Sequence, residues 1–113
     1  MAGRIATLSI ALALAACSSQ SDKQLIAVKS ARSVIAEWAL VERQAADGRA
    51  QATYVEQMRQ LAKDELKTDA RSLSQRPDAA NLLEQLRAGS PDAQTLKSAG
   101  DALEPLEDSL EAA

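Results

Sequence analysis

The chain has no histidine, and its 113 residues include a single cysteine, Cys17. Histidine is the side chain most often used as a proton carrier and metal ligand near neutral pH, so its absence removes the commonest catalytic group. One cysteine can form neither a disulfide within the chain nor a metal site built from several thiolates. The two scarcities together predict that the protein has no metal site.

Glycine is scarce as well, with four in the chain. Loops that hold phosphate groups need several closely spaced glycines, and neither such a loop nor the G-x-S-x-G nucleophile motif occurs. The sequence therefore predicts that the protein is not an enzyme and binds no non-covalent cofactor.

Aromatic residues are nearly absent: there is no phenylalanine, and Trp38 and Tyr54 are the only aromatic side chains. A core made mostly of leucine, valine and alanine suits closely packed helices, whereas a sheet would need β-branched and aromatic residues in alternation. No stretch of the chain alternates in this way. We therefore predict an all-α fold, a small helical hairpin or bundle of about three to four helices.

Acidic residues outnumber basic ones, 16 to 13, which gives no reason to expect nucleic-acid binding. The balance is uneven, because residues 77–113 hold two basic and eight acidic side chains. We expect the acidic C-terminal helix to lie along the basic sides of the preceding helices. Exposed ion pairs of this kind contribute about 0–1 kcal/mol each.

The N-terminal residues have the pattern of an export signal. Arg4 supplies positive charge, residues 5–14 form an apolar run, and two alanines precede Cys17. The run is too short for a membrane-spanning helix, which needs about twenty apolar residues. We predict a cleaved signal peptide over residues 1–16.

The tetrapeptide Leu14-Ala15-Ala16-Cys17 resembles the bacterial lipobox, and the resemblance covers residues 1–20. It implies that the Cys17 thiol carries a diacylglycerol group, that the chain is cut before Cys17, and that the freed amine carries a fatty acyl group such as palmitate. Two or three acyl chains, at about 0.8 kcal/mol per buried CH₂, hold a small domain on a membrane. Ser18 resembles the cue for outer-membrane sorting in enteric bacteria. The implied protein is a lipoprotein of the Gram-negative outer membrane that faces the periplasm; the alternative is an ordinary signal that leaves Cys17 as a free thiol.

After the lipidated N-terminus we expect a short tether over residues 17–22 and a single helical domain over residues 23–113. Apolar residues recur at helical spacing from about residue 23 to residue 46, where Asp47-Gly48 ends the pattern. A second helix is expected over residues 54–74. Thr53 and Glu56 have the spacing of a capping box at its start. The two helices should form an antiparallel hairpin.

Two shorter helices are expected after Pro77, over residues 78–88 and 91–111. Gly89 closes the first, and Ser90-Pro91 gives an N-cap followed by proline for the second. Pro105 deprives the last helix of one backbone hydrogen bond, so a kink or a break is expected near residues 101–104.

Trp38 has two interpretations, a partner-binding anchor or a core residue in the middle of the first helix. Lys23, Lys29 and Arg32 could contact anionic headgroups, or could form an ordinary solvated face. A set of carboxylates near the C-terminus could attract a cation or a basic partner, or could be a solvated face; it comprises Asp101, Glu104, Glu107, Asp108 and Glu111.

The function expected from these features is that of a membrane-anchored interaction or structural module whose partners are membrane lipid and another protein or a second copy. One alternative is a small toxic lipoprotein of the entericidin sort. Such a protein would require a basic amphipathic segment, and this chain has none after Cys17. Another is a bundle with a pocket for an apolar ligand, which the scarcity of aromatics argues against.

Overall fold

The computed structural model contains four α-helices and no strand over residues 2–113, which confirms the prediction of an all-α fold. It describes the backbone of residues 2–113 and the side chains of residues 20–113. The helices are α1 (Ala2–Ala46), α2 (Ala52–Ser72), α3 (Pro77–Ala88) and α4 (Ala93–Ala112).

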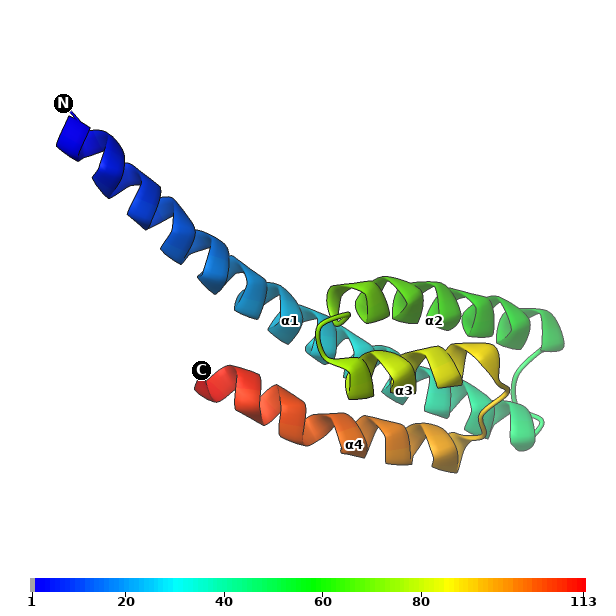
Figure 1. Cartoon of the computed structure of the whole chain (residues 1–113). Helices are drawn as coiled ribbons and strands as arrows, with labels where there is room; N and C mark the ends of the chain where they lie inside the picture. The colour runs from blue at the N-terminus through cyan, green and yellow to red at the C-terminus, as the bar shows by residue number, and fades with distance from the viewer. Residues whose placement is uncertain (1) are drawn as a thin grey trace.

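Successive helices run in opposite directions, and the N-terminal end of α1 projects past the other three (Figure 1). Helix α1 packs against both α2 and α4, while α3 packs mainly on α2. Helices α3 and α4 touch each other only sparsely. The predicted antiparallel hairpin is therefore present, and the two shorter helices cover it unequally.

The core lies where the faces of the four helices meet. Aliphatic side chains dominate it, and burying each one contributes about 1.5–3 kcal/mol relative to leaving it exposed. The largest fully buried side chains are Val28, Ile35, Leu66, Leu73, Leu83, Leu96 and Leu103. Every buried side-chain nitrogen or oxygen in the described part of the chain has a hydrogen-bond partner.

The start of the first helix differs from the prediction. Instead of beginning at about Lys23, α1 is already helical at residues 20–22, the last part of the expected tether. No proline or glycine lies between Arg4 and Asp47, and once a helix exists each added residue gains a hydrogen bond at little further cost. The polar residues Gln20, Ser21 and Asp22 therefore did not mark a boundary.

The predicted capping box of α2 is not formed. Gln51 is the N-cap and makes no side-chain hydrogen bond, so Thr53 lies inside the first turn and Glu56 just after it. Glu56 accepts a hydrogen bond from Arg59 at 3.5 Å. Because the N-cap lies two residues before Thr53, neither side chain is in the register that a capping box requires.

Helix α4 begins two residues later than predicted. Its N-cap is Asp92, whose carboxylate accepts a hydrogen bond from the Thr95 backbone N–H at 2.8 Å, and Ser90 and Pro91 belong to the preceding loop. A carboxylate satisfies an orphan N–H and complements the positive end of the helix dipole. The capping hydrogen bond lowers the pKa of Asp92.

The glycine and proline predictions have mixed outcomes. Gly48 has a φ of 69° in the loop after α1, the left-handed conformation that was expected there. Pro77 is the first residue of α3 rather than the residue before it, a position where the missing N–H costs nothing. The predicted break near residues 101–104 is absent, because α4 continues through Pro105.

Candidate functional site

The tetrapeptide that resembles a lipobox, Leu14-Ala15-Ala16-Cys17, lies outside the residues whose side chains the structure describes. Just beyond it, the Gln20 side chain donates a hydrogen bond to Oε1 of Gln75 at 2.7 Å. One turn later the buried Gln24 accepts a hydrogen bond from Nε of Arg76 at 3.3 Å. The packed body therefore begins three residues after Cys17, and the turn between α2 and α3 lies at that end of the molecule. We call these four residues, Gln20, Gln24, Gln75 and Arg76, the base.

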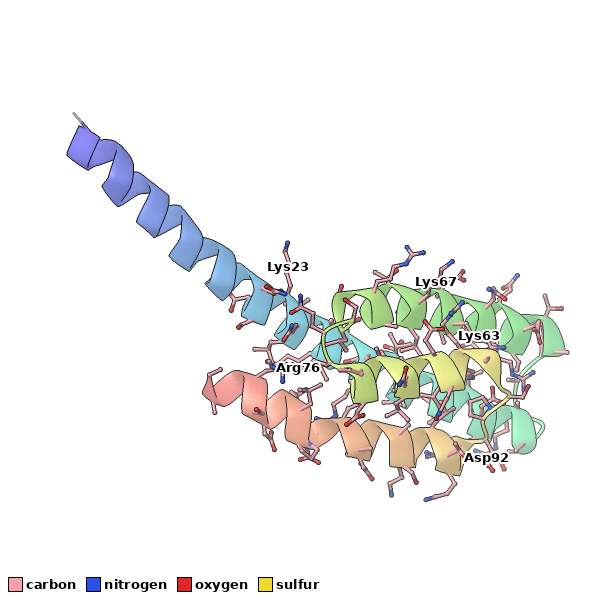
Figure 2. The ribbon with its side chains drawn as sticks, in the orientation of Figure 1. Lys23, Lys63, Lys67, Arg76 and Asp92 are labelled. Atoms are coloured by element: carbon pink, nitrogen blue, oxygen red, sulfur yellow. The ribbon has the colours of Figure 1, made fainter. Side chains whose placement is uncertain are left out.

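Two of the three cations suggested for headgroup contact pack against α4 instead. Nζ of Lys29 is 3.4 Å from Oε1 of Glu111. Nη1 of Arg32 is 3.1 Å from Oε2 of Glu107, and its Nε donates to the Gly100 carbonyl at 3.2 Å. The expected electrostatic complementarity is thus present between α1 and α4. Lys23 extends into solvent near the base (Figure 2).

The carboxylates near the C-terminus are divided between these pairs and solvent. Glu104 lies 3.9 Å from Nη2 of Arg32, alongside the closer Glu107 pair. Asp101 and Asp108 are exposed. Among the described residues, no group of three or more acidic, cysteine or histidine side chains is placed to hold a metal ion.

Trp38 is a core residue with 2% of its surface exposed. Its Nε1 donates to Oε2 of Glu42 at 2.8 Å, and Arg59 of α2 donates to both carboxylate oxygens of Glu42 at 2.7 Å. The Arg59 hydrogen bonds, with that of Trp38, hold the pKa of Glu42 below its ordinary value. The cluster joins α1 to α2, and contact between Trp38 and a partner would require the bundle to open.

Asp69 of α2 is a carboxylate in the interface with α1, 7% exposed. The Ser30 hydroxyl donates a hydrogen bond to its Oδ2 at 2.9 Å. Burial raises the pKa of Asp69, and the nearby negative charge of Glu65 adds to the effect. The ionised form of Asp69 therefore opposes folding near neutral pH.

Asp69→Asn is expected to raise the melting temperature at pH 7, since the amide can still accept from Ser30 and carries no charge. Because the folded state holds the Asp69 proton more tightly than the unfolded state, the wild-type free energy of unfolding falls as pH rises from the ordinary carboxyl pKa through the raised one. The variant should lose that contribution to the pH dependence. Thermal unfolding between pH 3 and pH 8 measures both effects.

Asp64→Asn is the matched control, because Asp64 lies exposed on the same helix. Its effect should stay within about 0.5 kcal/mol, as is usual for surface substitutions. A melting temperature that falls in the Asp69→Asn variant would show that the buried charge stabilises the helix pair.

An open groove lies between α3 and α4. One part, of about 840 Å³, begins at Gln75 and Arg76 of the base. A second part, of about 490 Å³, continues toward the Gly89 loop and shares Leu82, Gln85 and Ala102 with the first. We call the two parts together the α3–α4 groove. It exists because α3 rests on α2 and leaves α4 largely uncovered on that side.

The groove exposes two leucines, one on each of the helices that form it. Leu82 of α3 and Leu106 of α4 are both only partly buried against the core, and both line the groove. Around them the exposed lining is uncharged except at the base end, where Arg76 and Asp78 lie. This surface combines an apolar floor with polar but neutral walls, which is the composition of the centre of a protein interface.

The groove was not identified from the sequence. The last helix does carry a signal for it: residues facing the groove at helical spacing are all uncharged, although 26% of the chain is charged. They are Thr95, Ser98, Ala102 and Leu106. The pattern alone could not show that α3 would stand apart from this face.

No helix in the described part of the chain is long and apolar enough to cross a membrane. The features available for function are the base beside Cys17 and the α3–α4 groove. Comparisons with protein-family models, with characterised proteins and with solved structures find no match for this chain.

Proposed function

We propose that the protein is a lipoprotein of the bacterial cell envelope, anchored through Cys17, whose helical body serves as a non-enzymatic interaction module. The observation that carries the interaction part is the α3–α4 groove, where Leu82 and Leu106 remain half-buried in the single chain. The anchor part rests on the lipobox resemblance of residues 14–17.

The fold supports an anchor of this kind through the position of the base. Hydrogen bonds from Gln20 to Gln75 and from Arg76 to Gln24 hold the α2–α3 turn near the start of the mature chain. A chain cut before Cys17 would therefore have almost no free length between its lipid and its packed body. Acyl chains on Cys17 would keep the base next to the headgroups, where Lys23 is exposed to them.

The shape of the groove favours a macromolecular partner over a small ligand. Small-molecule sites bury about 70–90% of their ligand in a concave cavity. The α3–α4 groove is open along its length, and exposed residues such as Gln85 and Ala102 form its walls. A helix packed on this face would cover both half-buried leucines, and helices join in this way at axis separations of about 8–10 Å.

Cys17→Ala should abolish incorporation of a labelled fatty acid, leave residues 1–16 attached, and allow the protein to be extracted from membranes by an alkaline wash. Ser18→Ala is the matched control, since it changes the neighbouring side chain and keeps the thiol. The wild type and the control should both carry the label and stay with the membranes. Equal labelling of the Cys17→Ala variant would refute the anchor.

A further inference from the structure

We propose that the α3–α4 groove binds a second copy of this chain, so that the two copies form a parallel two-fold pair with both bases at the same end. In this pair α4 of each copy lies in the groove of the other. The inference names the partner of the proposed interaction module, and its parallel orientation rests on the proposed lipid anchor.

The neutral walls of the groove favour a second copy. A two-fold interface brings each surface against itself, so a charged side chain near the axis meets its own like charge. Ala102, Gln85 and Leu82 line both parts of the groove and so lie along the two-fold axis, which in a parallel pair runs along the length of the groove. None of the three is charged, and two copies can therefore approach there without repulsion.

The charges at the base end favour a parallel orientation. Arg76 and Asp78 both line the groove there, two residues apart, and neither takes part in an ion pair with any other described residue. In a parallel pair, residues at the same height face each other across the axis. Arg76 of each copy would then face Asp78 of the other and form two symmetric ion pairs.

An antiparallel pair would also bring one pair of opposite charges together. It places Arg76 of one copy beside the far end of the other copy's groove, near Asp92 (Figure 2). The Asp92 carboxylate, however, already caps α4 through the Thr95 N–H. An antiparallel pair would also point the two Cys17 anchors in opposite directions, which one flat membrane cannot accommodate. Parallel packing places both anchors in the same membrane and raises the local concentration of partners.

The exposed flank of α4 has the shape to enter a groove. Ser98, Ala102 and Pro105 project from it and are exposed in the single chain. Small side chains allow two helices to approach closely, and Leu106 beside them would then be covered. The resulting contact would join α3 and α4 of both copies as a four-helix layer.

The test uses the full-length, processed protein in native membranes, with one cysteine introduced by Ala102→Cys. With Cys17 acylated, the introduced thiol is the only one available to form a disulfide. Ala36→Cys is the matched control, because Ala36 is also exposed but lies on α1. A disulfide needs Cα atoms within about 7 Å, so mild oxidation should link Ala102→Cys chains into dimers at least about tenfold more than Ala36→Cys chains.

Charge reversal tests the orientation on the same membranes. Arg76→Asp alone and Asp78→Arg alone should each reduce the Ala102→Cys dimer, because each puts like charges across the axis. The double reversal restores opposite charges in a parallel pair and should recover the dimer. If the single reversals weaken the dimer but the double one does not recover it, the parallel orientation is wrong.

Membrane fractionation of the same samples separates the two proposals. Protein in the membrane fraction that yields no Ala102→Cys dimer overturns the second-copy proposal and leaves the anchor standing. Dimers in the aqueous fraction, or dimers of the wild type through an unmodified Cys17, overturn the anchor instead. Disulfides or photo-adducts at position 102 that contain a different protein or a lipid would assign the groove to that partner and refute the second copy.

Discussion

Trp38→Ala is expected to lower the free energy of unfolding by about 3–5 kcal/mol, the range for removing a large buried aromatic side chain. Trp38 lies in the C-terminal part of α1 and is 2% exposed. The change also removes the hydrogen bond from Nε1 to Glu42. The total free energy of unfolding of a small domain is about 5–15 kcal/mol, so this loss is a large fraction of the stability. Urea unfolding followed by far-UV circular dichroism measures it.

Two further variants separate volume from hydrogen bonding at this site. Trp38→Phe keeps most of the apolar contact but leaves Glu42 with Arg59 alone, and should cost less than Trp38→Ala. Tyr54→Ala removes an aromatic side chain that is 46% exposed and should cost less than about 1 kcal/mol. Equal losses for Trp38→Ala and Tyr54→Ala would show that Trp38 does not belong to the core in solution.

Leu83→Ala is expected to cost about 2–5 kcal/mol, since a fully buried leucine loses both its transfer free energy and its packing. Leu83 is 0% exposed in α3. Helix α3 has only 12 residues, and helices shorter than about 12–15 residues are barely stable without tertiary contacts. Loss of Leu83 should therefore release α3 from α2 and open the α3–α4 groove.

Leu61→Ala is the control for that change, because it deletes the same atoms from a leucine that is 52% exposed. Its cost should stay below about 1 kcal/mol. Amide hydrogen exchange would localise the effect of Leu83→Ala, with faster exchange expected in residues 77–88 than in α1. Unchanged exchange in α3 would show that α3 stays packed on α2 without the Leu83 side chain, against the packing described here.

Helical periodicity predicted the first helix correctly over residues 23–46. Apolar residues of that stretch, such as Val34 and Trp38, are buried in α1. The spacing of apolar residues is a property of many residues together, so a few polar residues on the apolar face do not obscure it. Helix number and approximate bounds followed from the same patterns and from the turns at Gly48 and Pro77.

Helix ends were predicted less well, because single side chains decide them. Thr53 has a side chain suited to cap α2, but the helix begins earlier, with Gln51 two residues before it as the N-cap. Asp92 and Ser90 both have side chains suited to an N-cap, and the helix begins at the carboxylate of Asp92, which accepts a hydrogen bond from the Thr95 N–H. Such competitions depend on neighbours that a local motif does not contain.

The groove was beyond the reach of sequence patterns for a different reason. Leu82 and Leu106 have the spacing of core residues, and their half-burial results from the placement of α3 on α2. Tertiary arrangement, which periodicity does not specify, thus determines which apolar side chains remain available to a partner. The proposal that Cys17 is an anchor, by contrast, rests on a short local motif and does not depend on the fold.

Mass spectrometry of the N-terminal peptide from protein isolated without reduction tests the central claim most directly. We predict that the mature chain begins at Cys17 and that this residue carries a diacylglycerol group on its sulfur, with a further fatty acyl group on its amine. A peptide that begins at Cys17 with a free thiol, or one that retains residues 1–16, would contradict it.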